Sequence, residues 1–164
     1  MLTVIRFMEE YTAEAIDAKG YDGTIPVERY HLPDFRLVLG NGTVVDGAGD
    51  AMKALQGVYA PFAEHLHDPT FLVTWETQDG YGMMGIANLF FNLHGPAPEA
   101  ETGRDGKKWH GVVNAAYRFF YVQDGESFKM KSTTIFADVS PVLKTMLTNK
   151  LIDGEGLAGF VLQS

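Results

Sequence analysis

The chain has 164 residues, of which 46% are hydrophobic and 12% aromatic, a composition typical of one folded domain and not of a disordered chain. Its formal net charge of −8, with no basic run longer than Lys107-Lys108, argues against nucleic acid and anionic membrane surfaces as partners. There is no cysteine, which excludes disulfides, thiolate nucleophiles and cysteine-ligated zinc. No stretch reaches the roughly 18 consecutive apolar residues that a membrane helix needs, so we expect a soluble, cytoplasmic protein.

The first third of the chain has helical patterns interrupted by a short hairpin. Residues 3–18 carry apolar side chains at helical spacing, and Pro26 opens a second, short helical piece that extends to residue 30. Residues 35–39 are typical of a strand, and the turn Gly40-Asn41-Gly42 predicts that 43–45 pairs with it. A third one-sided apolar stripe predicts a helix over residues 50–62.

The second half is dominated by strand patterns. Four such segments follow one another: Thr70–Glu76, Tyr81–His94, Lys107–Gln123 and Glu126–Asp138. Asp79-Gly80 and Asp124-Gly125 supply hairpin turns between neighbours. This order predicts an α+β fold, in which a cone-shaped, curved, antiparallel (mixed) sheet carries three N-terminal helices on its concave face. A C-terminal helix and flap over 139–164 would complete a single barrel-like domain spanning 1–164.

The long strands leave open which side chains point into the cone. Side chains alternate between the two faces of a strand, so each strand has two lists of residues, one for each face. In the last strand the more apolar list takes every second residue from Phe128 to Phe136, and we expect this list to face inward. By the same rule Tyr117 and Tyr121 face inward, whereas Asn114 and His94 belong to the polar lists of their strands. A β-bulge would switch the phase and bring His94 or Asn114 inside. Both arrangements remain possible at this stage.

No motif of high specificity is present, such as a P-loop, a dinucleotide fingerprint, HExxH or a nucleophile elbow. His65 and His67 lie two residues apart just before a predicted strand and could share a metal, but no third ligand at a fitting spacing is evident. We therefore expect neither a metal nor a cofactor.

The order of elements over residues 3 to 138 resembles the nuclear-transport-factor-like cone, the fold of SnoaL-like polyketide cyclases and scytalone dehydratase. The local resemblance is carried by Ile16-Asp17-Ala18-Lys19-Gly20-Tyr21-Asp22, by His67 before Val73-Thr74-Trp75-Glu76, and by His94 at a strand end. It implies a pocket that contains Asp17, His67, His94 and Asn114.

The sequence also departs from the dehydratase pattern. Two tyrosines that hold a carbonyl-bound water in that enzyme are replaced by Ile16 and Leu39, which puts dehydration by that route in doubt. The phenols of Tyr117 and Tyr121 could act from a different wall of the pocket. The fold hosts many chemistries as well as non-catalytic binders, so the resemblance implies a class and not a reaction.

The residue types in this set suit cofactor-free proton transfer. His67 would take a proton from carbon alpha to a carbonyl, Asp17 would orient its imidazole, and His94 and Tyr117 would complete the catalytic set. The remaining candidates are substrate-binding residues: Tyr121, Asn114, Arg36 and Trp75. Each has an ordinary alternative, such as a surface position for Arg36 or a core position for Trp75.

The expected function is a cofactor-free isomerase, cyclase or dehydratase acting on a polycyclic, oxygenated small molecule of secondary-metabolite biosynthesis. The alternative is a non-catalytic binding module or dimeric adaptor of the same fold. By analogy with this fold we also expect a homodimer.

Overall fold

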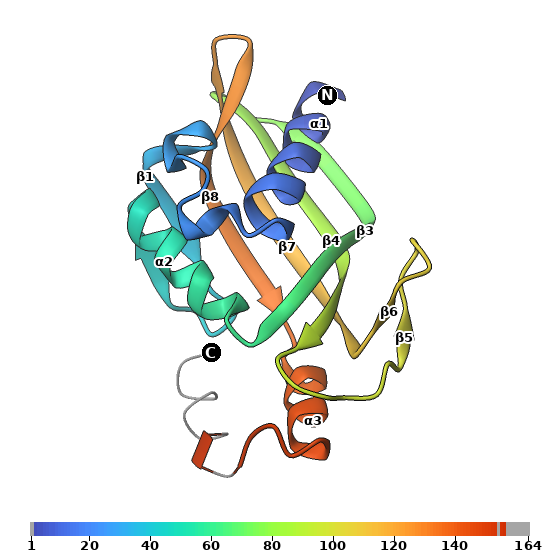
Figure 1. The fold of residues 1–164 in the computed structure, drawn as a ribbon. Helices are drawn as coiled ribbons and strands as arrows, with labels where there is room; N and C mark the ends of the chain where they lie inside the picture. The colour runs from blue at the N-terminus through green and yellow to red at the C-terminus, as the bar shows by residue number, and fades with distance from the viewer. Residues whose placement is uncertain (1, 154, 157–164) are drawn as a thin grey trace.

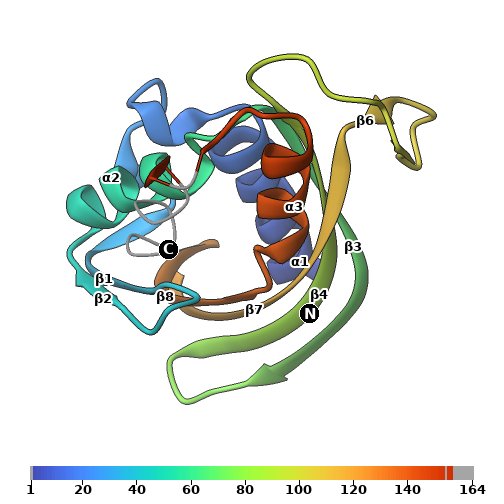
Figure 2. The same cartoon turned by 90° about the horizontal axis from the view of Figure 1, so that it is seen from below.

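The computed structural model describes residues 2–153 and 155–156 and shows one strongly curved sheet around two helices (Figures 1 and 2). The main sheet has six strands in the order β2-β1-β8-β7-β4-β3. These strands are β1 (His31–Val38), β2 (Val44–Asp46), β3 (Phe62–Glu76), β4 (Gly80–Leu93), β7 (Gly111–Asp124) and β8 (Ser127–Ala137). A small second sheet pairs β5 (Glu101–Thr102) with β6 (Lys108–Trp109).

Strand pairing confirms the predicted mixed α+β architecture. The long strands β3, β4, β7 and β8 pair antiparallel in a meander, while β1 runs parallel to β8. Within the described residues the sheet is open and is no closed barrel, because β2 and β3 form its two edges.

The helices cover the concave face of this sheet, as Figure 2 shows from below. They are α1 (Leu2–Tyr11), a π-helix (Thr12–Asp17), two short 3-10 helices (Gly20–Asp22 and Val27–Arg29) and α2 (Ala48–Tyr59), whereas α3 (Ser140–Thr148) follows the sheet and lies at its lower end in Figure 1. The apolar stripes expected for the first and third helices are buried here, with Val4, Ala51 and Leu55 at most 3% exposed. Within the described residues no helix is both long and apolar enough to cross a membrane.

The first predicted helix is not uniform. Its α-helical part ends at Tyr11, and the next turn is a π-helix in which the Ala18 amide donates to the Ala13 carbonyl oxygen at 3.0 Å. Asp17 is the last residue of this wider turn.

Strand β3 begins at Phe62, well before the expected start at Thr70. His65 and His67 therefore lie inside a strand and not in the loop that precedes it. Pro69 is tolerated there because β3 is an edge strand, and the pairing register shifts between Pro69 and Phe71.

A bulge in β8 also decides which side chains face the interior. Phe120 pairs with Ser132 but Tyr121 pairs with Met130, so Lys131 is an extra residue. Beyond it Thr133 and Ile135 turn inward, whereas Phe136, expected inside, is 49% exposed. The expectation that one inward list runs through to Phe136 is therefore wrong.

The predicted C-terminal flap over 139–164 begins with α3, which packs against β7 and buries Val142. Residue 154 and residues 157–164 of the flap lie outside the described residues.

Candidate active site

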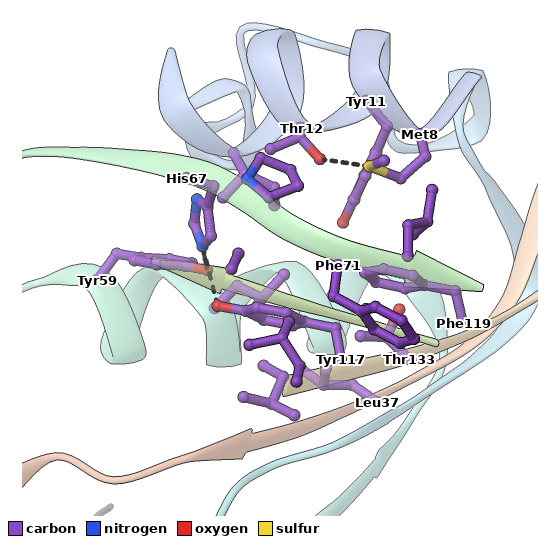
Figure 3. A pocket seen from close by; sticks show the side chains of 18 of the residues that line it. Met8, Tyr11, Thr12, Leu37, Tyr59, His67, Phe71, Tyr117, Phe119 and Thr133 are labelled. Carbon is purple, nitrogen blue, oxygen red and sulfur yellow. Dashed lines mark hydrogen bonds between the residues drawn. The ribbon is translucent and has the colours of Figure 1, made fainter. Parts of the chain in front are cut away.

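An apolar cavity lies between the helices and the concave face of the sheet (Figure 3). Its volume is about 60 Å³. The sheet contributes Leu37, Ala87, Phe119 and Ile135, and the helices contribute Met8 and Leu55. Walls of this kind suit a compact apolar ligand whose orientation is set by a few polar groups.

The main polar group of the cavity wall is His67, which is held by Asp17. The imidazole Nδ1 lies 2.6 Å from the Asp17 Oδ1, and the backbone N–H of His67 donates to both carboxylate oxygens at 3.2 Å. The two side chains are only 6% and 14% exposed, respectively. Because an ionised carboxylate only accepts hydrogen bonds, Nδ1 must carry the proton, which leaves the lone pair of the neutral ring on Nε2.

Two phenols face this Nε2 atom. The hydroxyl of Tyr117 lies 3.0 Å from it and the hydroxyl of Tyr59 lies 3.3 Å from it. Burial raises the pKa of both phenols above the ordinary tyrosine value, and the nearby Asp17 carboxylate raises both pKa values further. Both hydroxyls therefore remain protonated at neutral pH and serve as hydrogen-bond donors.

The end of the π-helix is tied to the start of β3, and this places Asp17 beside His67. Lys19, in a left-handed conformation with φ of 60°, donates from Nζ to the carbonyl oxygens of Phe62 and Ala63 at 3.3 and 2.8 Å. From the strand side, His65 Nε2 donates to the Ile16 carbonyl oxygen at 3.1 Å.

His65 also supports the second phenol. Its ring stacks on Tyr59 with centroids 4.4 Å apart and planes 9° from parallel. Burial, reinforced by His67, lowers the pKa of His65 to about 4, so the ring is neutral.

Asp17, His65 and His67 offer ligand atoms within 4.8 Å of one another and could together hold a metal ion. Asp17 is the third ligand that spacing alone did not reveal, because it lies fifty residues before His67. In this structure the set is engaged in hydrogen bonds: His67 Nδ1 to Asp17, and His65 Nε2 to the Ile16 carbonyl. A metal at His67 Nδ1 would have to replace that proton.

The structure thus brings together three of the expected catalytic residues, Asp17, His67 and Tyr117. The fourth, His94, follows the end of β4 on an exposed bend, away from the cavity. Tyr121 is buried in the core, where its hydroxyl contacts the Met83 sulfur at 3.6 Å, and it does not line the cavity.

The remaining expected binding residues lie outside the cavity because of strand alternation. Asn114 is on the outer face, where its amide donates to Asn88. Arg36 alternates with the buried Phe35 and Leu37 and forms an exposed ion pair with Asp46 at 2.7 Å.

Trp75 also lies outside the cavity. It follows the β3 register shift, is 38% exposed, and packs edge-on against Phe120 on the outer face.

Sequence reasoning missed four hydroxyls of the cavity wall: Tyr11, Thr12, Tyr59 and Thr133. The two tyrosines belong to the apolar stripes of the first and third helices, where an aromatic residue is ordinarily core. Tyr11 has a partner of its own, since its hydroxyl lies 3.4 Å from His31 Nε2. No sequence signal distinguishes these positions from simple packing residues.

No protein-family model matches the sequence, and no curated protein does either. Solved structures do match the fold. A proposed scytalone dehydratase from Novosphingobium aromaticivorans is 13% identical, covers 84% of this chain and 83% of its own, and has a TM-score of 0.64. Aln2 from a Streptomyces species is 17% identical over 87% of this chain and 93% of its own, with a TM-score of 0.60.

A proposed dehydratase of the NTF2-like family from Streptomyces avermitilis is 12% identical over 84% of this chain and 95% of its own, with a TM-score of 0.61. At such low identities the likeness concerns the fold alone. The resemblance to the nuclear-transport-factor-like, SnoaL-like cone is thereby confirmed: this chain has that fold.

Proposed function

We propose that the protein is a cofactor-free acid–base enzyme, an isomerase, cyclase or dehydratase, acting on a cyclic oxygenated small molecule. The observation that carries the proposal is the hydrogen-bonded series from Asp17 through His67 to Tyr117 and Tyr59 at one end of an apolar cavity. A buried base with an oriented lone pair and two protonated donors beside it suits enolisation.

The first step follows from this geometry. A substrate carbonyl oxygen accepts the hydrogen bonds of Tyr59 and Tyr117, which releases Nε2 of His67. Nε2 then takes a proton from the carbon next to the carbonyl, and the electron pair of that C–H bond forms the enolate. The phenols stabilise the developing oxyanion, and one such donor contributes about 3 kcal/mol. The Asp17 carboxylate stabilises the resulting imidazolium.

The second step decides the reaction type. Return of the proton from His67 to another carbon of the conjugated system gives isomerisation. Attack of the enolate carbon on a second carbonyl of the same molecule, whose oxygen takes the proton from His67, gives cyclisation. Loss of a hydroxyl from the neighbouring carbon, which leaves as water after taking that proton, gives dehydration. All three routes use the same first step.

The size of the cavity bears on the substrate. A volume of about 60 Å³ is below the roughly 150 Å³ of a cavity that holds benzene, so even a substrate of one ring requires the walls to part, and an extended polycycle requires a still larger opening. A role in secondary metabolism is part of the proposal and is supported by the fold resemblance alone.

The test is proton exchange in deuterium oxide. We expect the protein to catalyse exchange of the hydrogens alpha to the carbonyl of simple cyclic ketones, followed by NMR. His67→Gln should abolish this catalysis, and Asp17→Asn should lower the rate by about 10²- to 10⁴-fold. Both variants should remain folded by circular dichroism.

His94→Gln is the matched control, since this exposed histidine should be replaceable without loss of rate. Equal rates in wild type and His67→Gln would reject the proposal. Ketone binding without exchange in any form of the protein would favour the alternative, a binding module that uses the same cavity without chemistry.

A further inference from the structure

One hydroxyl of the cavity has no partner. Among the described residues, three buried side-chain polar atoms lack a hydrogen bond, namely His65 Nδ1, Trp109 Nε1 and Thr133 Oγ1. Of the three residues only Thr133 lines the cavity, and it is 6% exposed. Its hydroxyl can both donate and accept.

The other hydroxyls of the cavity wall are already engaged. Tyr59 and Tyr117 face His67, the Tyr11 hydroxyl lies 3.4 Å from His31, and Thr12 donates to the Met8 sulfur at 3.5 Å. Within the part of the chain that the structure describes, Thr133 therefore carries the one cavity hydroxyl without a hydrogen-bond partner.

The position of Thr133 is set by the sheet. The bulge at Lys131 turns Thr133 inward, and it pairs with Phe119, two residues along β7 from Tyr117. Two residues along a strand span about 7 Å and neighbouring strands lie about 5 Å apart, so the Cα atoms of Thr133 and Tyr117 are about 8 Å apart. Figure 3 shows Thr133 beside Phe119, with His67 toward the other end of the cavity.

The residues around the Thr133 hydroxyl are apolar and offer it no hydrogen bond. Its cavity neighbours Leu37 and Phe119 are apolar, and a buried hydroxyl without a partner destabilises the free protein, whereas a valine of the same shape would not. A ligand oxygen at this end of the cavity would supply the missing hydrogen bond.

We infer that Thr133 forms a second polar subsite, which binds an oxygen substituent on the side of the substrate ring remote from the reacting carbonyl. The inference rests on the proposed function, because the reacting carbonyl is assigned to the Tyr59 and Tyr117 end. The substrate class is thereby narrowed to cyclic ketones that carry a second oxygen across the ring, such as a hydroxyl, an ether or a carbonyl.

The test compares cyclohexanone with 4-hydroxycyclohexanone. In the wild type we expect the hydroxylated ketone to bind about 5- to 10-fold more tightly, as measured by NMR titration. Thr133→Val should remove this preference and leave the affinity for cyclohexanone unchanged. Thr133→Ser should retain the preference, and Thr133→Val should have an equal or higher melting temperature because it removes the unpartnered hydroxyl.

Two outcomes overturn the subsite: a preference that survives in Thr133→Val, or an equal loss of affinity for both ketones, which would indicate a packing role. Alpha-proton exchange is measured on the same samples. If exchange depends on His67 but Thr133→Val has no effect on binding, the subsite is rejected and the proposed function stands. Absence of exchange with both ketones rejects the proposed function, and absence of binding rejects both.

Discussion

His31 and His65 are buried as neutral rings, and neither has a carboxylate partner among the described residues. His31 is 3% exposed, with Nδ1 donating to the Val27 carbonyl oxygen at 3.1 Å and Nε2 near the Tyr11 hydroxyl. Burial lowers the pKa of His31 to about 4, against the opposing effect of the hydrogen bond to Val27 and with a small additional contribution from Lys129. His65 is 4% exposed, and burial likewise lowers its pKa to about 4, against the opposing effect of Asp17.

These shifts predict a loss of stability on mild acidification. In the unfolded chain a histidine has a pKa of about 6.5, so between roughly pH 6.5 and 4 the unfolded state binds more protons than the native state. The stabilisation is therefore complete above pH 6.5, declines as the pH falls, and is lost near pH 4. Each of the two histidines contributes up to about 3 kcal/mol to this decline. Urea unfolding at pH 7, 6, 5 and 4.5 measures it.

His31→Gln separates this effect from the titration of carboxylates. The variant should be less stable than the wild type at pH 7, because it loses packing against Phe35 and Tyr11. Its free energy of unfolding should then fall less steeply between pH 6.5 and 5. Parallel pH profiles for the two proteins would show that His31 is not held neutral in the native state.

At the scale of elements, the junction between the π-helix and β3 determines the catalytic geometry. Asp17 ends the π-helix, and the chain then turns sharply. The turn brings Gly20 so close to the helix that a Cβ at this position would lie 2.6 Å from the Glu14 carbonyl oxygen. Lys19 fixes this turn against the start of β3 through two backbone carbonyls. Asp17 can meet His67 only while this connection holds.

Lys19→Met should therefore weaken activity through the position of Asp17. We expect a fall of about 1 kcal/mol in the free energy of unfolding, since a charged donor is lost from two carbonyl groups. The rate of ketone exchange should fall by about tenfold, with little change in ketone affinity. Urea unfolding and NMR exchange rates measure the two effects.

The control for Lys19→Met is Lys53→Met, because the Lys53 ion pair with Asp50 is exposed and involves no residue of this junction. It should leave both quantities unchanged. An unaltered exchange rate in Lys19→Met would show that Asp17 holds its place without this connection.

The pairing of the strands explains which residues of the site can be predicted from the sequence and which cannot. Apolar alternation alone leaves the phase of β7 open, and the family resemblance places Asn114 in the pocket. Because β4 and β7 pair without a register shift, Tyr117 faces inward as expected, whereas Asn114 faces outward. Local patterns do not reveal the bulge at Lys131 in β8, so the inward turn of Thr133 could not be predicted. Likewise, a tyrosine in an apolar helical stripe gives no sign that its hydroxyl reaches a histidine on another element, as Tyr59 does.

The whole molecule has two unlike faces. Helices and the cavity occupy the concave face, whereas the convex face of the sheet bears an exposed set of large apolar side chains. This outer patch consists of Val73, Trp75, Met84 and Phe136, each 38–49% exposed. It spans the strands β3, β4 and β8, with Arg118 and Phe120 of β7 between them. Exposed apolar surface of this kind is typical of a protein interface.

We propose that a second copy of the chain covers the outer patch, as a homodimer in which the two convex faces meet. A self-complementary apolar surface suits a two-fold interface, because the same side chains are contributed by both partners. Each chain carries a net charge of −8, so the two copies repel at low ionic strength. Salt should therefore favour association, since it screens this repulsion while apolar contacts persist.

Light scattering coupled to size exclusion should give twice the 18.1 kDa of one chain at 0.15 M salt, and partial dissociation at 0.01 M salt. Val73→Glu, at a residue that pairs with Met84, would bury a charge within the interface and should give a monomer at both salt concentrations. Val44→Glu, at a residue that is 51% exposed on the edge strand β2, should remain dimeric. A wild-type monomer at 0.1 mM protein, or a dimer that survives Val73→Glu, would contradict this arrangement.

Because Val73 does not line the cavity, the Val73→Glu monomer should still catalyse His67-dependent ketone exchange.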